Sequence, residues 1–314
     1  MLNRINKETN KMVYTITLNP SVDYFIHTDS LVLGEINRVN NCDFFAGGKG
    51  INVSRLLDNL DVKSVACGFV GGFTGSFIKE ELNKSQIKTN FVELDGNTRV
   101  NVKINSGVDT EINGAGINIS KNNLDQLIRK IKTDIVDGDY LVLSGSVPAS
   151  TVENVYGYII KELPNTKVVL DTTCSNLLDN LKYKPFLIKP NDKELAEMFN
   201  VEINSLNQIV KYGKKLKDFG AVNVMISLGK DGAVLISDSG IYQATVPVSE
   251  VINAVGAGDS TVAGFISRCI LGETMDMVLQ FACACGTATA TCRDLATKDY
   301  IYNVLEKISI KKIG

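Results

Sequence analysis

The sequence predicts an α/β fold in which a mostly parallel β-sheet lies between layers of helices. Strand-like and helix-like segments alternate along almost the whole chain. Several strand-like segments are short apolar runs without polar alternation, which is typical of strands buried on both faces. The chain has 314 residues, 44% of them hydrophobic, which is enough to build the core of one large domain.

The expected strands are short and rich in β-branched residues. They are Val13–Leu18, Val62–Val70, Tyr140–Leu143, Lys167–Asp171, Phe186–Ile188, Val222–Ser227 and Val234–Ile236. The expected helices have apolar residues three or four positions apart. They are Ile51–Leu60, Thr74–Asn83, Leu124–Ile131, Val152–Glu162, Lys193–Phe199, Leu206–Asp218, Asp259–Leu271, Met275–Thr291 and Lys298–Ile308.

Two stretches, Asp23–Phe45 and Asn90–Asn113, interrupt this alternation and read as strands and turns. Within the second, Thr98–Ile104 alternates polar and apolar residues, so its side chains point to two different faces. We expect these stretches to form a small accessory sheet that covers the main domain. The polar face of the alternating strand carries Arg99, Asn101 and Lys103.

The first eleven residues are polar and are expected to form a frayed tail, with a single domain spanning residues 12–314. The net charge of −2 and the pI near 5.6 favour neither nucleic acid nor an anionic membrane as a partner. The seven cysteines include no C-x-x-C pair, and His27 is the only histidine. This pattern predicts reduced thiols in a cytosolic protein without a zinc site.

The sharpest motif is Asn253-Ala-Val-Gly-Ala-Gly-Asp-Ser260, followed by an apolar helix. A glycine-rich turn at a helix start gathers backbone N–H groups at the positive end of the helix dipole, which favours anions. Asp259 lies in the first turn, where the dipole favours its ionised form, and could accept a proton from a hydroxyl. The alternative is an ordinary helix cap. Neither G-x-x-x-x-G-K-[ST] nor G-x-G-x-x-G occurs, which argues against a P-loop kinase and a typical dinucleotide fold.

Together with Ala46-Gly-Gly-Lys-Gly-Ile-Asn-Val-Ser54, this motif makes the chain resemble the ribokinase-like carbohydrate kinases, the phosphofructokinase-B-type family. Further matching segments are Ser144-Gly-Ser-Val-Pro148, Lys189-Pro-Asn-x-x-Glu194 and Ser227-Leu-Gly-x-x-Gly232. The resemblance implies Rossmann-like layering of the sheet, a lid that closes over a sugar, ATP as co-substrate and Mg²⁺. It also implies a homodimer formed through the lid.

Finer features resemble the branch of this family that phosphorylates D-fructose 1-phosphate to D-fructose 1,6-bisphosphate. They are Thr17-Leu-Asn-Pro-Ser-Val-Asp23 and Thr98-Arg-Val-Asn-Val-Lys103. Phosphorylation of tagatose 6-phosphate or fructose 6-phosphate by the same fold remains an alternative. A non-catalytic sugar-phosphate sensor is an alternative of another class. A nicotinamide-dependent dehydrogenase is disfavoured because the dinucleotide-binding motif G-x-G-x-x-G is missing.

The resemblance also implies a role for each motif residue. Asp259 would be the catalytic base, with the backbone amides of Gly256, Ala257 and Gly258 as the anion hole. The sugar would be bound by Asp23, Gly47, Gly48 and Asn52. The phosphate already on the sugar would be bound by Lys49, Arg99 and Lys103, with Asn101 between the last two. Without the resemblance, Arg99, Asn101 and Lys103 would be interpreted as the solvent-exposed face of a strand.

The nucleotide side of the site is implied by the two later motifs. Lys189 and Asn191 would contact the phosphates of ATP, and Glu194 would hold Mg²⁺ through water. The alternative for this segment is a capped turn between a strand and a helix, and both readings can hold together. The loop beneath the ATP ribose and phosphates would comprise Ser227, Leu228, Gly229, Lys230, Asp231 and Gly232, with Gly258 completing the phosphate contacts.

Overall fold

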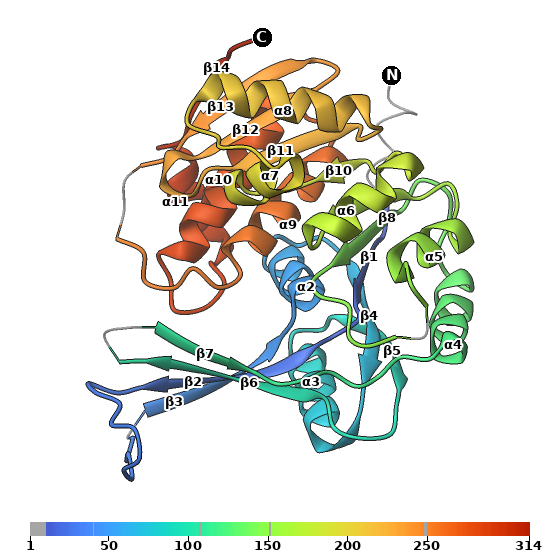
Figure 1. Ribbon diagram of the computed structural model, residues 1–314, viewed down its shortest axis with the longest axis vertical. Coiled ribbons are helices and arrows are strands. Elements are labelled where there is room, and N and C mark those ends of the chain that lie inside the picture. The colour runs from blue at the N-terminus through green and yellow to red at the C-terminus, as the bar shows by residue number, and fades with distance from the viewer. Residues whose placement is uncertain (1–10, 40, 107–108, 151, 248–249) are drawn as a thin grey trace.

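The computed structural model describes residues 11–39, 41–106, 109–150, 152–247 and 250–314 (Figure 1). In this part of the chain, two β-sheets are present: a large one of ten strands and a smaller one of four. The large sheet has the order β14-β13-β12-β11-β10-β9-β8-β1-β4-β5. Its strands are β1 (Val13–Thr17), β4 (Ser64–Val70), β5 (Lys88–Glu93), β8 (Tyr140–Ser144), β9 (Lys167–Asp171), β10 (Leu187–Ile188), β11 (Asn223–Ser227), β12 (Ala233–Ser237), β13 (Gly240–Thr245) and β14 (Ser309–Lys312).

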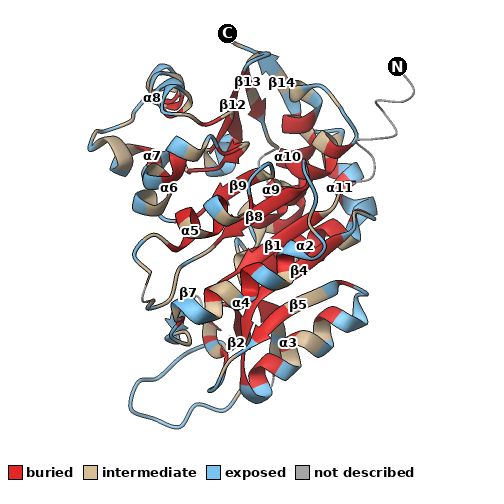
Figure 2. Cartoon of the chain, turned by 90° about the vertical axis from the view of Figure 1, so that its right-hand side faces the viewer, coloured by how far each residue is buried: buried red, intermediate tan, exposed pale blue. Residues whose placement is uncertain are grey.

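The predicted fold class is confirmed. Neighbouring strands along the series β5-β4-β1-β8-β9-β10-β11 pair in parallel. Strands β12, β13 and β14 extend the sheet beyond β11 with antiparallel pairing. Side chains of β1 alternate between two cores, so Tyr14 and Ile16 face one helix layer whereas Val13 faces the other. Figure 2 shows the buried residues concentrated along the central strands and the helix faces that cover them.

Helices cover both faces of the large sheet. One layer contains α4 (Lys121–Lys132), α5 (Val155–Glu162), α6 (Cys174–Asn180), α7 (Asp192–Phe199) and α8 (Leu206–Asp218). The opposite layer contains α2 (Lys49–Asn59), α9 (Ala257–Ile270), α10 (Met275–Ala290) and α11 (Lys298–Leu305). A further helix, α3 (Gly72–Lys84), packs near β5 and the smaller sheet.

The smaller sheet stands beside the large one and extends away from it (Figure 1). We call it the small sheet; its strands are β3 (Asn41–Gly47), β2 (Ser21–His27), β6 (Arg99–Asn105) and β7 (Asp109–Asn113), in that spatial order. Of the stretch Asn90–Asn113 that the sequence assigns to an accessory sheet, the first residues instead belong to β5, which pairs with β4 in the large sheet.

Several elements differ from the sequence prediction for identifiable reasons. The helix expected from Val152 begins only at Val155, because the Asn154 side chain accepts from the backbone N–H of Gly157 as its N-cap. The last helix ends at Leu305, and the polar strand β14 then pairs at the sheet edge. Helix α6 has seven residues, too few for a clear periodicity, and neither it nor β13 was predicted.

The seven cysteines are free thiols, as predicted. Within the described ranges, no helix is both long enough and apolar enough to cross a membrane.

Helices α9 and α10 pack closely because Gly264 of α9 has no side chain. A Cβ at this position would lie 2.7 Å from Cys285 Sγ and 3.0 Å from the backbone Cα of Ala282. This contact matters for the site because α9 carries the glycine-rich turn at its N-terminus.

We predict that Gly264→Ala lowers the free energy of unfolding by about 1–3 kcal/mol, because the added methyl group forces two helix backbones apart. Gly213→Ala in α8 is the matched control, since its Cβ would meet side-chain atoms of Ile236 and Ile226, the nearest being their terminal methyl groups, rather than a backbone. Urea unfolding of the two variants checks this. An equal or smaller loss in Gly264→Ala would contradict the proposed backbone contact.

Candidate active site

A cavity of about 530 Å³ lies at the carboxyl ends of β1, β8 and β9, between the large sheet and the small sheet. Ligands of open parallel sheets bind at this edge. We call it the first cavity. Its lining residues include Asn19, Asp23, Gly48, Lys49, Asn52, Arg99, Asn101, Lys103, Ser144, Asp171, Lys189, Glu194, Gly256, Gly258 and Asp259.

The glycine-rich turn forms the start of α9. Gly256 is the N-cap residue and adopts a φ of 78°, a left-handed conformation that glycine tolerates without strain. The Ala257 N–H donates to the carbonyl oxygen of Ala254 at 3.3 Å, whereas the amides of Gly258 and Asp259 in the first helical turn have no partner within the helix and can bind an anion. Asp259, 5% exposed, accepts a hydrogen bond of 2.9 Å from Asn52 Nδ2.

The pKa of Asp259 is raised from 3.8 to about 6. Burial is the main cause and the nearby negative charge of Asp171 adds to it, while Lys49, Asn52 and Lys189 act in the opposite direction. The position in the first turn of α9 favours the ionised form, but burial and Asp171 raise the pKa of Asp259 on balance. A carboxylate with this pKa is largely ionised at pH 7 and is a stronger base than an exposed aspartate.

Asp171 is a central residue of the site that the motif analysis missed. It ends β9 and is buried, with its Oδ1 3.0 Å from Lys49 Nζ and its Oδ2 3.6 Å from Lys189 Nζ. Burial would raise the pKa of Asp171, but the two lysines hold it below its usual value. Its position offered a signal, because it is the polar last residue of an apolar strand predicted at the ligand-binding edge.

Lys49 therefore lies against Asp171 rather than beside Arg99 or Lys103. Burial alone would lower the pKa of Lys49, but the charges of Asp171 and Asp259 raise it above its ordinary value. Lys189 lies close to the glycine-rich turn: a Cβ at Gly258 would lie 3.2 Å from Lys189 Nζ. Both ammonium groups belong to residues that line the first cavity with this turn.

The small sheet contributes a second wall of the first cavity. Asp23 on β2 accepts hydrogen bonds from Ser21 Oγ at 2.7 Å and from Asn101 Nδ2 at 3.1 Å. Gly47 lies directly behind Asp23, because a Cβ there would come within 2.6 Å of all three carboxyl atoms. Gly47 thus supports Asp23, whereas Gly48 lines the cavity itself.

Arg99 and Lys103 both line the cavity but are four residues apart on β6, a separation of about 13 Å along the strand. The Arg99 guanidinium donates to the carbonyl oxygens of Asn19 and Gly114. Lys103 Nζ lies 3.7 Å from Asp23 Oδ2 and 3.8 Å from Glu111 Oε1. The two cations therefore occupy different ends of the cavity.

Several buried polar atoms in this cavity lack a hydrogen-bond partner among the described residues. Leaving such atoms unpaired is costly, so they mark places where a polar ligand would fit. The hydroxyls and phosphate oxygens of a sugar phosphate could supply the missing partners. The atoms are Thr17 Oγ1, Arg99 Nε, Asn101 Oδ1 and Ser144 Oγ.

A second cavity of about 600 Å³ adjoins the first at Ala254 and Gly258. One wall is the face of α10 that carries Cys283, Gly286 and Thr287, whose small side chains leave room for a flat group. The other walls contain the residues that the sequence assigns to the nucleotide: Asn191, Ser227, Leu228, Gly229, Lys230, Asp231 and Gly232, together with Ala257 of the glycine-rich turn.

Asn191 and Glu194 cap α7 reciprocally. Glu194 N donates to Asn191 Oδ1 at 2.7 Å, and Asn191 N donates to Glu194 Oε2 at 2.8 Å. The capped turn is therefore present; Glu194 also lines the first cavity, and its contact with Mg²⁺ through water stays a prediction. In the described ranges no group of three or more His, Cys, Asp or Glu side chains could hold a metal ion. Mg²⁺ typically keeps several waters and binds few protein ligands besides substrate phosphates, so a single carboxylate such as that of Glu194 would suffice to hold it through water.

Comparisons with known proteins agree with this geometry. The model of the pfkB family carbohydrate kinases matches residues 16–299. A 1-phosphofructokinase from Bacillus subtilis is 41% identical over 304 residues, covering 96% of this chain and all of the relative. A D-tagatose-1-phosphate kinase from Bacillus licheniformis is 38% identical over 302 residues, covering 95% of this chain and 99% of the relative.

A solved structure has the same architecture. Phosphofructokinase-2 from Escherichia coli in complex with fructose-6-phosphate superimposes with a TM-score of 0.88 at 26% identity, covering 94% of this chain and 98% of that one.

Asp171→Asn should destabilise the fold by about 3 kcal/mol or more, because it leaves the buried Lys189 ammonium without its carboxylate. Glu162→Gln is the matched control: it breaks the ion pair with Lys132, whose two side chains are nearly half exposed, and should cost less than about 1 kcal/mol. Denaturant unfolding at pH 7 compares them. Equal small losses would show that Asp171 does not stabilise the paired lysines.

Proposed function

The chain belongs to the pfkB family of carbohydrate kinases, and on this premise we propose that it transfers the γ-phosphoryl group of ATP to the 6-hydroxyl of D-fructose 1-phosphate. The observation that supports this most directly is the junction of the two cavities at Gly258, beside the buried carboxylate of Asp259. The proposed kinase domain spans residues 12–314, and its products are fructose 1,6-bisphosphate and ADP.

In this proposal the sugar lies in the first cavity and ATP in the second. Asp23 and the unpaired Oδ1 of Asn101 accept hydrogen bonds from the sugar hydroxyls, and Arg99 binds the phosphate that the sugar already carries. The Arg99 guanidinium donates hydrogen bonds to two backbone carbonyl oxygens, so its orientation is fixed before the ligand binds. Fixed donors of this kind reduce the entropy lost on binding.

Asp259 accepts the proton of the 6-hydroxyl as the hydroxyl oxygen attacks the γ-phosphorus. The bond from that phosphorus to the bridging oxygen breaks, and ADP leaves. The amides of Gly256, Ala257 and Gly258, together with Lys189, stabilise the negative charge on the transferred group. Mg²⁺, when bound, would supply further positive charge at the phosphate oxygens, and Glu194 would hold it through water.

Four sugar phosphates, the 1-phosphates and the 6-phosphates of fructose and tagatose, are to be compared as substrates. One relative of this chain is named a D-tagatose-1-phosphate kinase, and a ketohexose 1-phosphate is common to that name and to the proposed substrate. The 6-phosphates of fructose and tagatose place the existing phosphate at the other end of the sugar. Turnover with the four sugar phosphates at saturating Mg-ATP would rank them.

We also propose that the enzyme works in the cytosol as a homodimer joined through the outer face of the small sheet. This face is apolar and largely uncovered: Phe44 is 53% exposed and Ile112 is 60% exposed, and the rings of Tyr24 and Phe44 stack at 4.4 Å. An apolar sheet face of this kind is normally covered by a partner.

Asp259→Asn should reduce kcat for ADP release with fructose 1-phosphate by about 10²–10⁴-fold, because the amide cannot accept the proton. Asp276→Asn, at the first turn of α10 and outside both cavities, is the matched control and should keep the parent rate. A coupled assay of ADP formation measures both. A folded parent enzyme that binds the sugar phosphate without releasing ADP would instead support a non-catalytic sensor.

Phe44→Lys should convert the dimer to monomer, because it places a charge within the proposed apolar contact. Val136→Lys introduces the same charge at a slightly more exposed residue, 60% against 53%, in the loop between α4 and β8. Sedimentation velocity at micromolar concentration distinguishes them. A parent protein that is already monomeric, or a Phe44→Lys variant that stays dimeric, would rule out this interface.

A further inference from the structure

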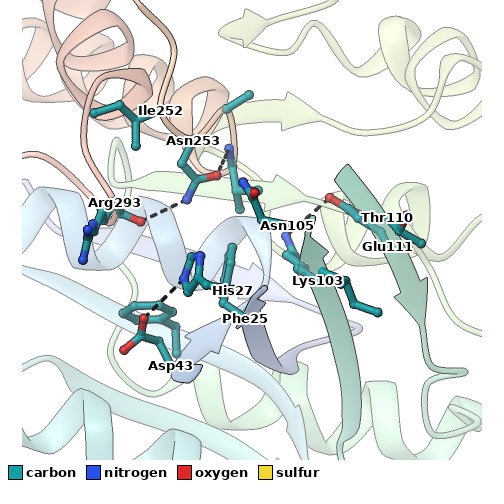
Figure 3. Close-up of a pocket in the computed structure, with 14 residues that line it drawn as sticks. Phe25, His27, Asp43, Lys103, Asn105, Thr110, Glu111, Ile252, Asn253 and Arg293 are labelled. Carbon is teal, nitrogen blue, oxygen red and sulfur yellow. Dashed lines mark hydrogen bonds and ion pairs between the residues drawn. The ribbon is translucent and has the colours of Figure 1, made fainter. Parts of the chain in front are cut away.

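A chamber of about 160 Å³ separates the inner face of the small sheet from the loop that precedes α9 (Figure 3). It joins the first cavity, because Lys103, Glu111, Ala254 and Val255 line both. The small sheet provides one wall, with Phe25 and Phe45 packed edge to face. The opposite wall consists of Ile252–Val255 and Arg293.

Two ion pairs line the small-sheet wall of this chamber. His27 Nε2 lies 3.6 Å from Asp43 Oδ2, and Lys103 Nζ lies 3.8 Å from Glu111 Oε1 (Figure 3). Arg293 on the opposite wall forms no ion pair with the described residues. The informative residue of the chamber is Asn253, whose side chain joins two loops.

Asn253 hydrogen-bonds in both directions through its side-chain amide. Its Oδ1 accepts from the backbone N–H of Val255 at 3.0 Å, and its Nδ2 donates to the carbonyl oxygen of Arg293 at 3.0 Å (Figure 3). The first bond fixes the loop that leads into the glycine-rich turn. The second ties this loop to the segment after α10, forty residues further along the chain.

Both ends of this connection adjoin the glycine-rich turn. Val255 directly precedes Gly256, the N-cap residue of α9. Leu295, two residues after Arg293, lies behind that glycine, because a Cβ at Gly256 would come within 2.8 Å of Leu295 Cδ2. The relative position of the two loops therefore determines where the first amides of α9 point.

We propose that Asn253 is a positioning residue for phosphoryl transfer, which acts by holding the amides of the Gly256–Asp259 turn in their anion-binding orientation. The rate consequence of this inference rests on the proposed kinase function. An amide suits the position because it offers an acceptor and a donor on one short side chain. A serine at this position would keep only the acceptor. Its hydroxyl oxygen can accept from the nearby backbone N–H of Val255 in a local turn.

Kinetics provide the first test. Asn253→Ala should lower kcat about tenfold or more while the KM for fructose 1-phosphate changes by less than about twofold, since misplaced anion-hole donors act on the transition state rather than on sugar binding. Asn253→Ser should recover part of that loss by restoring the bond to Val255. Thr110→Ala, on the small-sheet wall of the same chamber, is the control and should retain the parent kcat.

A loss of thermal stability in Asn253→Ala with an unchanged kcat per folded enzyme would overturn the proposal, because that pattern belongs to a purely structural contact. Equal losses in the alanine and serine variants would overturn the role of the Val255 bond.

Hydrogen exchange of the full-length protein provides a test that does not depend on the sugar. In Asn253→Ala the amides of Val255 to Asp259 should exchange faster than in the parent, while those of β6 stay unchanged. Unaltered exchange at the turn would overturn the inference even if the kinase assignment is right. Faster exchange in a protein that phosphorylates none of the four sugar phosphates would support the positioning role while refuting the proposed function.

Discussion

The carboxylate of Asp171 is buried between the ammonium groups of Lys49 and Lys189, and it lies close enough to Asp259 to raise the pKa of that second carboxylate. A buried charge of this kind persists only when it is well paired. The pairing requires α2, β9 and the segment after β10 to meet at one point, so the fold and the chemistry of the site depend on the same contact.

Each part of the molecule supplies a different function around this contact. The large sheet brings the ends of β1, β8 and β9 together, and α9 adds the amides of Gly258 and Asp259 beside Lys189. The small sheet adds Asp23, Asn101 and Arg99 from strands that pair with one another. The anion-binding groups thus sit on the rigid core, whereas the proposed sugar ligands sit on a sheet that projects from it (Figure 1).

The sequence was sufficient for the fold class and for most lining residues, because both depend on local patterns such as apolar runs and glycine-rich turns. It was not sufficient for properties that arise only from tertiary contacts. The pKa of Asp259 depends on burial and on Asp171, which no motif contains. Lys49 stands within a recognisable motif, yet its partner is 122 positions away. Strand β14 is polar and forms only because β13 offers an edge.

The central claim is that the charge of Asp171 adds to the effect of burial in raising the basicity of Asp259. It is tested most directly by the pH dependence of kcat/KM for fructose 1-phosphate in the parent and in Asp171→Asn, measured below the unfolding temperature of the variant. The titration of the substrate phosphate is common to both proteins and cancels in the comparison. Because Asp171 raises the pKa of Asp259, the acidic limb, near pH 6 in the parent, should move to lower pH in the variant. An acidic limb that stays in place or moves to higher pH would contradict the account.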